Sequence, residues 1–494
     1  MKRNSKEIKE AQKTARKTKY IFLAAAVFCL IFAVVYECFS HGVISWFMLL
    51  AWTVPMTGGF VPMLIFGRRK MARYFPGCLS RYCWYTWIGL FTVAMILKGV
   101  LDIYGTTNKL LNLYWKLGIC AAVISLAFWI FGPILHGSSD KNPVNPNYLK
   151  KAHWPFQIIA IAAITALTVY FVCDTFVITR VYAVVDNSDS AEVSTETESR
   201  QYSIDVTLDT EENVDTEEIS EESGSETEKT NDGQSADTIS ESDASAYQEP
   251  QITDSSYSDD QIEIKLTEYE EYGTTIYVAD IRLASPEFLQ TAFAQGAYGR
   301  NVTAVTSRIA EGVDAILAIN GDFYGSQENG YVIRNGVLYR DEGDDGQEGL
   351  AIMSDGSFLV YDEGEISAEE LLAEGAVQTL SFGPALVVDG EVSVGEDDEV
   401  GKAKESNPRT AIGIIDDLHY VMVVSDGRTS ESAGLSLLEL AQVMQELGVE
   451  TAYNLDGGGS STMYFNGEVV NNPTTNGRSI SEREVSDILY IGQV

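Results

Sequence analysis

The sequence predicts a chain in two halves. The first is an N-terminal all-α membrane bundle of five transmembrane helices, and the second is a C-terminal α+β domain with a mixed, hairpin-rich sheet and flanking helices. Three observations support this. Five apolar stretches of helix length occupy residues 20–179. Alternating apolar and polar residues, separated by turn signals, fill residues 261–494. An acidic stretch with few aromatic residues separates the two regions.

The five apolar stretches each contain about 17–24 residues, the length that carries a helix across a bilayer. They lie near Tyr20–Tyr36, Val43–Phe66, Tyr82–Tyr104, Trp115–Leu135 and Phe156–Ile178. We do not interpret the first stretch as a signal peptide, because no clear small-residue cleavage site follows it and four more spans do. The lipid bilayer is therefore the first predicted partner.

The basic residues of the loops predict the orientation. The tail of residues 1–19 contains eight Lys or Arg, the loop of residues 67–81 contains five, and the loop of residues 136–155 contains three. The two other loops contain only Lys109. Loops rich in Lys and Arg stay on the cytoplasmic side. We therefore expect a multi-pass plasma-membrane protein with a cytoplasmic N-terminus and an extracytoplasmic C-terminal domain.

Charge and cysteine content restrict the partners further. The net charge of -37 argues against nucleic acid or an anionic membrane surface as a partner. All six cysteines lie in or beside the membrane half, so the exported part is expected to fold without disulfides.

The acidic stretch is predicted to be a disordered, extended linker. From about Asp186 to Asp260, about two dozen carboxylates face only Arg200 and Lys229, and such a chain buries too little apolar surface to fold. A calcium-collecting or wall-spacing role is the alternative. The predicted domains are thus a basic tail (1–19), a five-span region (20–179), the linker (180–260) and a folded domain (261–494).

Turn and cap signals define the elements of the folded domain. Strands are predicted at Ile262–Leu266, Thr275–Leu283, Ala315–Asn320, Arg409–Ile415 and His419–Ser425. Hairpin turns are predicted at Asn335-Gly336, Asp355-Gly356, Asp389-Gly390 and Asn466-Gly467. Helices are predicted over Val302–Ala310, after Ser367, and after Ser436, where Glu439 completes a capping box.

One stretch is the strongest candidate for a site: Asn454-Leu-Asp-Gly-Gly-Gly-Ser-Ser-Thr-Met463. It places the carboxylate of Asp456 at the end of a predicted strand, followed by three glycines and three hydroxyl residues. Successive N–H groups in such a turn can converge on an anion. The plain alternatives are a glycine hairpin loop and a carboxylate that caps its own turn.

Four other predicted strands carry polar groups at one end, which is where ligand sites are commonly built. The motifs are Asn320-Gly-Asp-Phe-Tyr324, Ser381-Phe-Gly-Pro384, Asn407-Pro-Arg-Thr-Ala-Ile-Gly413 and Ser425-Asp-Gly-Arg428. Each motif alone is weak, because a turn or a surface ion pair explains it equally well. Their recurrence in one domain favours a site.

Together with the stretch around Asp456, these motifs and their order resemble the phosphodiester glycosidase family, over roughly Ala279 to Ile491. The family pattern Asn-Gly-Gly-Phe-Phe is Asn-Gly-Asp-Phe-Tyr in this chain. The resemblance implies a membrane-tethered, extracytoplasmic hydrolase that cleaves the glycosidic bond of sugar-1-phosphodiesters. The implied partner is a sugar phosphodiester or a cell-surface glycan or glycolipid.

The resemblance also implies roles for individual residues. Asp456 is expected to act as nucleophile or as base for a water, and Asp322 as a second acid. Arg409, with Arg428 as second choice, is expected to stabilise charge on the phosphate. The expected substrate-binding residues are Asn320, Gly321, Asp426, Arg428, Asn454, Gly457, Gly458, Gly459, Ser460, Ser461 and Thr462.

Other chemistries lack their sequence signals. The domain has no Gly-x-Ser-x-Gly elbow for a serine hydrolase and no histidine cluster for zinc. Its carboxylates leave calcium open, but no loop has EF-hand spacing, so we expect no required cofactor. Two alternatives remain: a non-catalytic protein of glycan binding or exopolysaccharide assembly, and a membrane half that itself acts on a lipid carrier. Sugar release by residues 261–494, lost in Asp456→Asn, would separate enzyme from binding protein.

Overall fold

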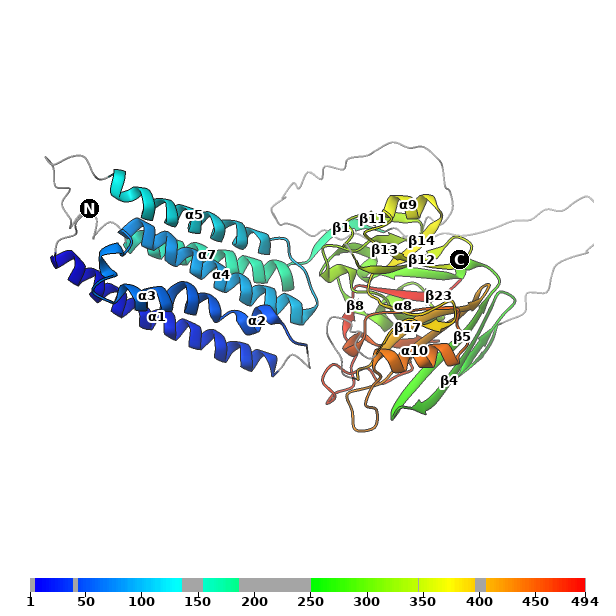
Figure 1. Cartoon of the computed structure of the whole chain (residues 1–494). Helices are drawn as coiled ribbons and strands as arrows, with labels where there is room; N and C mark the ends of the chain where they lie inside the picture. The colour runs from blue at the N-terminus through cyan, green and yellow to red at the C-terminus, as the bar shows by residue number, and fades with distance from the viewer. Residues whose placement is uncertain are drawn as a thin grey trace, which may run out of the picture. The chain divides into compact units, whose positions relative to one another are not determined.

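The computed structural model describes residues 5–38, 43–135, 154–185, 250–344, 346–395 and 406–493. It confirms the predicted fold class: a helical N-terminal region and a C-terminal domain of mostly β structure with flanking helices (Figure 1). The predicted basic loop of residues 136–155 and most of the predicted linker lie outside the described residues.

The N-terminal region contains five helical segments whose length and apolar composition would let each cross a membrane: Ile8–Glu37, Trp46–Phe66, Cys78–Tyr104, Leu111–Phe131 and Gln157–Phe176. The helices are α1 (Ser5–Glu37), α2 (Trp46–Leu50), η1 (Pro55–Phe60), α3 (Val61–Phe66), η2 (Ala72–Tyr74), α4 (Cys78–Tyr104), α5 (Leu111–Leu135) and α7 (Trp154–Phe176). The second span is thus a composite of α2, η1 and α3.

Helix α1 begins fifteen residues before the first predicted span, inside the predicted tail. The reason is packing: Ala11 and Ala15 are buried against Met63 and Phe75, in one cluster that also contains Phe22. Small apolar residues four apart lie on one helix face, so the basic segment continues the helix and presents its Lys and Arg on the other faces.

Both ends of the predicted linker are strands in the structure. β1 (Arg180–Val184) pairs antiparallel with β7, and β2 (Gln251–Thr253) with β3 (Ser256–Ser258) adds a hairpin to the edge of the main sheet. The prediction that the linker spans residues 180–260 was therefore wrong at both ends. Tertiary pairing orders these short segments, and their partners lie far away in the sequence or in a hairpin of three-residue strands.

The main sheet of the domain has nine strands in the order β16-β15-β19-β17-β18-β5-β4-β3-β2. Their bounds, besides β2 and β3, are β4 (Ile262–Glu271), β5 (Thr274–Leu283), β15 (Ala385–Val388), β16 (Glu391–Val392), β17 (Arg409–Asp416), β18 (His419–Ser425) and β19 (Thr451–Asn454). A second sheet has five strands in the order β21-β20-β9-β23-β6. These are β6 (Leu289–Phe293), β9 (Leu317–Asn320), β20 (Met463–Phe465), β21 (Glu468–Val469) and β23 (Asp487–Ile491).

Smaller elements complete the domain. A three-stranded sheet, β13-β12-β14, and the pairs β10–β11, β1–β7 and β22–β8 are the remaining β structure. The strands are β7 (Ala297–Arg300), β8 (Ala304–Val305), β10 (Val332–Arg334), β11 (Val337–Arg340), β12 (Glu348–Met353), β13 (Phe358–Asp362), β14 (Ala376–Leu380) and β22 (Glu484–Val485). The helices are η3 (Pro286–Phe288), η4 (Ala294–Gly296), α8 (Thr306–Gly312), η5 (Tyr324–Ser326), α9 (Ala368–Ala373), α10 (Leu437–Glu446) and η6 (Gly458–Ser460).

Every strand pair among the described residues is antiparallel. The prediction of a mixed sheet was therefore wrong, although the predicted fold class is confirmed. The physical reason is loop length. A parallel pair needs a long crossover, whereas two-residue turns return the chain beside itself. All four predicted turns do so, joining β10 to β11, β12 to β13, β15 to β16 and β20 to β21.

Two of the predicted helix starts are confirmed in detail. Ser367 and Ser436 each accept a hydrogen bond from the backbone N–H three residues on. In turn, the carboxylates of Glu370 and Glu439 accept a hydrogen bond from the backbone N–H of the cap residue. The third predicted helix is shorter than expected, because Ala304 and Val305 pair with β22 before α8 begins.

The apolar core lies between the sheets. Ile264, Ile281 and Met422 of the nine-stranded sheet share one buried cluster with Ile319 and Leu489 of the five-stranded sheet. Helix α10 covers the opposite face of the nine-stranded sheet, and α8 that of the five-stranded sheet. This arrangement brings the polar ends of β9, β17, β18 and β19 together, because the register pairs Arg409 with Ser425 and Ala411 with Asn454.

Candidate active site

Asp456 lies two residues beyond the end of β19, at the entrance of the glycine turn. Its Oδ2 accepts a hydrogen bond from Ser460 Oγ (2.6 Å) and from Arg483 Nη2 (3.2 Å), and Arg483 Nε also donates to Ser460 Oγ (3.0 Å). The Asp456 side chain is 18% exposed and that of Arg483 is 45% exposed. A carboxylate with one guanidinium above it is thus open to a ligand from solvent.

Two further arginines approach the same turn. Arg428 donates from Nε and Nη2 to Asn407 Oδ1 and from Nη1 to the Thr475 carbonyl. Burial and the charge of Arg483 lower the pKa of Arg428, and Asp456 opposes this. Burial, then the charge of Arg428, lowers the pKa of Arg409 to about 10. Arg409 and Arg428 remain cationic at neutral pH, so the surroundings of Asp456 attract anions.

Arg409 differs from the other two in its setting. Its side chain is buried, and its Nε donates to the Leu435 carbonyl (2.9 Å). The sequence analysis predicted Arg409 as the first choice for a cation that binds the phosphate. The structure brings its main chain into the site but turns its Nε toward Leu435, so Arg428 and Arg483 are better placed beside Asp456.

Asn320 holds three of the predicted segments together. Its Nδ2 donates to the Asp456 carbonyl (2.7 Å), and its Oδ1 accepts from Thr410 Oγ1 (2.9 Å) and from the Thr462 amide (3.2 Å). The side chain is fully buried. Asn320 is therefore occupied in joining β9, β17 and the turn after Asp456, and it orients the carboxylate through the main chain. Its neighbour Gly321 is also part of this junction, because its carbonyl accepts from the Asp456 amide (3.4 Å).

The glycine turn offers fewer free amides than its sequence suggests. Gly458, at φ +64°, donates its N–H to the Pro408 carbonyl (2.8 Å), and the amides of Ser460 and Ser461 close local turns. A Cβ on Gly458 would lie 2.9 Å from Arg428 Nη2, so glycine is needed there to let the guanidinium approach. Of the three glycine amides that were expected to bind an anion together, that of Gly458 is already used.

Three buried polar atoms near this turn have no partner among the described residues: Asn454 Oδ1, Ser461 Oγ and Thr462 Oγ1. Asn454 Nδ2 donates to the Gly383 carbonyl (2.8 Å), which fixes the amide against the predicted Ser381–Pro384 motif. A buried polar group without a partner is costly. Three such groups in one region are consistent with polar atoms that bind a ligand or an ordered water.

Asp322 lies in a different environment from that expected of a second acid. Its Oδ2 accepts from Arg334 Nη2 (3.1 Å) and from the Ser381 amide (3.0 Å), and its Oδ1 accepts from the Tyr324 amide (2.9 Å). Its side chain is 0% exposed. The prediction of Asp322 as an acid facing the ligand was therefore wrong in its geometry, because Arg334 and two amides enclose the carboxylate.

Arg334 pairs with a second buried acid that the sequence analysis did not identify. Asp487, the first residue of β23, accepts from Arg334 Nε (3.0 Å) and Nη2 (2.7 Å) through Oδ2, while its Oδ1 has no partner among the described residues. Burial, then the neighbouring charge of Asp322, raises the pKa of Asp487 to about 8 against the opposing effect of Arg334. A Cβ on Gly321 would lie 2.5 Å from Asp487 Oδ1, so glycine is needed there.

Asp426 is also occupied by the protein itself. Its two oxygens accept from the Asn472 amide (2.8 Å), Asn472 Nδ2 (3.0 Å), Asn471 Nδ2 (3.3 Å) and Tyr277 Oη (3.4 Å). These contacts pin the segment after β21 to the end of β18. The predicted role of Asp426 in substrate binding therefore has no free acceptor to support it, and we assign it to holding the loops.

The structure thus brings together Asp456, Arg409, Arg428, Asn320 and Asn454 from four strand ends, as the sequence analysis expected. It adds Arg483, Arg334 and Asp487. Arg334 lies just before the predicted Asn335-Gly336 turn, but that turn signals a hairpin and not a site. Neither Arg483 nor Asp487 belongs to a motif named above, so only tertiary contacts reveal their roles.

No group of three or more His, Cys, Asp or Glu side chains arranged to hold a metal ion occurs within the described ranges. Most of the acidic linker, for which calcium was the alternative, lies outside those ranges.

Asp487 predicts a pH dependence of the stability of the domain. Its pKa is about 8 in the fold and about 3.9 in an unfolded chain, so folding binds a proton between these values. Stability from this group is present below pH 4 and is lost as pH rises toward 8. We expect the unfolding temperature of the β domain, followed by circular dichroism, to fall from pH 5 to pH 8. In Asp487→Asn this fall should be smaller, and an equal slope in both proteins would contradict the assignment.

Comparison with known proteins identifies the class of the domain. Residues 314–492 match the family model of phosphodiester glycosidase domains, and all five motifs named above lie within that range. The C-terminal part of this chain is therefore a phosphodiester glycosidase domain.

The relatives themselves are distant. An uncharacterized SPbeta prophage-derived protein of Bacillus subtilis, YomE, is 33% identical over 184 residues, which cover 36% of this chain and 28% of that protein. The N-acetylglucosamine-1-phosphodiester alpha-N-acetylglucosaminidase of Mus musculus is 30% identical over 175 residues, which cover 32% of this chain and 33% of the mouse protein. The chain thus spans about a third of the length of these relatives.

Among solved structures, the zebrafish N-acetylglucosamine-1-phosphodiester alpha-N-acetylglucosaminidase catalytic domain, auto-inhibited by its pro-peptide, is similar at 21% identity and a TM-score of 0.39. The match covers 47% of this chain and 83% of that domain.

Proposed function

We propose that the domain hydrolyses the bond between the anomeric carbon of a sugar and the oxygen of a phosphodiester, and that Asp456 is its catalytic carboxylate. The observation that carries this proposal is the pairing of a partly exposed Asp456 with Arg483, beside Arg428. A carboxylate stabilises the positive charge of a sugar-like transition state. Guanidinium groups beside it stabilise the negative charge of a phosphate leaving group.

The reaction balances without a cofactor. Water adds to the anomeric carbon, the bond from that carbon to the phosphate oxygen breaks, and the phosphate monoester leaves with the electron pair. Of the two water protons, one stays on the new sugar hydroxyl and the other goes to the phosphate monoester or to solvent. Asp456 acts either as the nucleophile of a covalent intermediate or as the base for the water. Ser460, which donates to Asp456 Oδ2, holds the carboxylate in position.

The leaving phosphate requires stabilisation more than protonation, since a phosphate monoester is already a good leaving group. Arg428 and Arg483 supply two planar, permanently charged donors for the phosphate oxygens. Arg409 contributes a third charge from its buried position. The unpartnered hydroxyls of Ser461 and Thr462 supply candidate donors to the sugar or phosphate.

The proposed setting follows from the membrane half. Five helices long and apolar enough to cross a membrane precede the domain, and the basic loops favour a cytoplasmic N-terminus. The domain would then act outside the cytoplasm, on phosphodiester-linked sugars of cell-surface glycans or glycolipids. Cysteine labelling provides a test: Cys38 lies in the first predicted outer loop and is exposed, so a membrane-impermeant maleimide should label it in intact cells.

The decisive experiment measures sugar release. The full-length protein, purified in detergent, would be incubated with a panel of sugar-1-phosphodiesters that includes an α-N-acetylglucosamine-1-phosphodiester. Free sugar and phosphate monoester should appear in equal amounts. If the panel binds but no member turns over, the function is that of a glycan-binding protein and the hydrolase proposal is wrong.

Arg483→Lys tests the phosphate contact. Lysine keeps the charge but loses the fork that reaches both Asp456 and Ser460. We expect kcat/KM for the phosphodiester to fall about 10- to 100-fold, the equivalent of one charge-assisted hydrogen bond. Arg478→Lys, an exposed arginine of the same loop, is the matched control and should be unchanged. Equal values for both variants would remove Arg483 from the site.

A further inference from the structure

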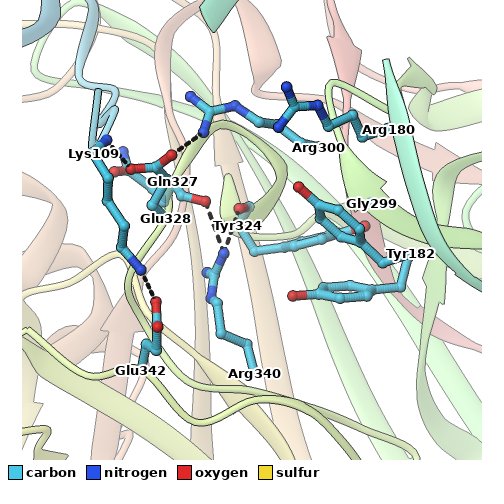
Figure 2. Close-up of a pocket in the computed structure, with 11 residues that line it drawn as sticks. Lys109, Arg180, Tyr182, Gly299, Arg300, Tyr324, Gln327, Glu328, Arg340 and Glu342 are labelled. Carbon is cyan, nitrogen blue, oxygen red and sulfur yellow. Dashed lines mark hydrogen bonds and ion pairs between the residues drawn. The ribbon is translucent and has the colours of Figure 1, made fainter. Parts of the chain in front are cut away.

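A cavity in the domain is distinct from the Asp456 cluster. It has a volume of about 220 Å³ and is lined by three tyrosines and four basic side chains, shown in Figure 2. All its lining residues except Lys109 come from the β domain and its entering strand β1. It shares with the five motifs only Tyr324, the last residue of the motif that begins at Asn320.

The charge of the lining is opposite to that of the chain. Of its four cations, Lys109, Arg180 and Arg300 each pair with one carboxylate, those of Glu342, Asp174 and Glu328. The fourth, Arg340, gives the lining its excess of positive charge. The whole chain carries a net charge of -37. A local excess of cations in so acidic a protein favours an anionic ligand.

Two of the arginines have donors to spare. Arg340 donates to the carbonyls of Gly330, Tyr324 and Gln327 (2.6, 3.1 and 2.8 Å) and pairs with no carboxylate in the described part of the chain. Burial lowers the pKa of Arg340. Arg300 is 5% exposed, and its Nη1 donates to Glu328 (2.6 Å). Its Nε is buried without a partner in the ranges described. Guanidinium groups of this kind are suited to a phosphate.

The tyrosines form one wall. Tyr182, Tyr298 and Tyr324 follow one another with ring centroids 5.8 and 5.4 Å apart, and the second pair is stacked at 18°. Tyr182 is 54% exposed. Tyrosine is enriched where a protein meets the headgroup layer of a bilayer, because its ring is apolar and its hydroxyl is polar.

Chain connectivity places this cavity at the membrane surface. Helix α7, the last that could cross the membrane, ends at Phe176, and β1 begins at Arg180. Four residues of extended chain reach at most about 14 Å. Arg180, which lines the cavity, also pairs with Asp174 in the last turn of α7. The wall formed by Arg180 and Tyr182 is therefore within reach of lipid headgroups.

We propose that this cavity binds the phosphate of an anionic lipid headgroup in the leaflet that the domain faces. The contacts are charge-assisted hydrogen bonds from Arg180, Arg300 and Arg340, with the tyrosine wall beside the glycerol or sugar part of the headgroup. The site fixes the domain at the bilayer and holds it near lipid-linked substrates. It rests on the proposed membrane topology and is independent of the proposed reaction.

The test uses the full-length protein in a neutral detergent and native mass spectrometry. Dioleoylphosphatidylglycerol is expected to bind at least about tenfold more tightly than zwitterionic dioleoylphosphatidylcholine. Arg180→Gln, and separately Arg300→Gln with Glu328→Gln, should each lower the affinity for phosphatidylglycerol about tenfold, the loss of one charge-assisted contact. The double variant removes the buried ion pair as a unit, so that no unpaired charge is left.

The controls decide between sources of phosphate. Arg308→Gln alters an arginine that is 77% exposed on α8 and should leave lipid binding unchanged. Inorganic phosphate at millimolar concentration should not displace the lipid; full displacement would assign the cavity to free phosphate instead. Equal binding of both lipids, or unchanged binding in both variants, would overturn the proposal. Asp456→Asn should bind the lipid like the parent protein, so failure of the hydrolase proposal would be seen separately.

Discussion

Replacing Asp456 with asparagine is expected to lower kcat for sugar release by about a thousandfold or more, within the range for loss of a catalytic carboxylate. Asparagine has the same shape and can still accept from Ser460 and Arg483 through its amide oxygen. It provides neither a nucleophilic charge nor a base. KM should change little, because the phosphate contacts of Arg428 and Arg483 remain.

The assay should compare release of free sugar with binding of the same phosphodiester. Asp416→Asn, in which an acid that is 68% exposed is changed, is the matched control and should retain full turnover. If Asp456→Asn hydrolyses as fast as the parent protein, Asp456 is not the catalytic acid. If the parent protein binds the ester and never turns it over, the site is a binding site only.

Replacing Arg334 with methionine is expected to give the largest loss of stability in the domain. Arg334 is buried between Asp322 and Asp487 and donates to both. Removing it leaves the enclosed carboxylate of Asp322 without a counter-charge, and above the pKa of about 8 also that of Asp487. Breaking a buried pair in this way costs about 3–5 kcal/mol. Protonation of Asp487 should reduce this loss at low pH, since burial already raises its pKa to about 8.

Hydrogen exchange of the full-length protein measures this directly, because it reports the opening of individual strands. Amides of β10 and β23, which carry Arg334 and Asp487, should lose protection in Arg334→Met, while helices α4 and α5 should not change. Arg308→Met, at an exposed arginine, should exchange like the parent protein. Unchanged protection of β23 in Arg334→Met would mean that the ion pairs do not stabilise the fold.

The interplay of Asp322 and Arg334 also accounts for a departure from the family pattern. Where the family pattern has a second glycine, this chain has Asp322. The structure gives that carboxylate a buried guanidinium and the amides of Ser381 and Tyr324 as partners. A substitution that resembled an additional catalytic acid is therefore part of the interior support of the site.

Much of the architecture was predictable because it depends on local sequence. Asn-Gly and Asp-Gly pairs favour tight hairpins whatever surrounds them, and all four were found. Ser367 and Ser436 start helices because their hydroxyls satisfy orphan amides of the first turn. Membrane-spanning stretches follow from length and apolar content alone. The linker ends and the antiparallel pairing of every described sheet were missed, since pairing partners lie far apart in sequence.

The residues around Asp456 divide in the same way. That Asn320, Arg409 and Asn454 end or begin strands could be predicted locally, because polar groups beside apolar runs mark strand ends. Which of these side chains face a ligand depends on contacts between segments that are distant in the chain. Asn320 and Asp426 are occupied by the protein, Asp322 is enclosed by Arg334, and Arg483 joins Asp456 from a loop without a motif. Hydrogen-bond partners and burial are properties of the assembled fold, and local sequence does not contain them.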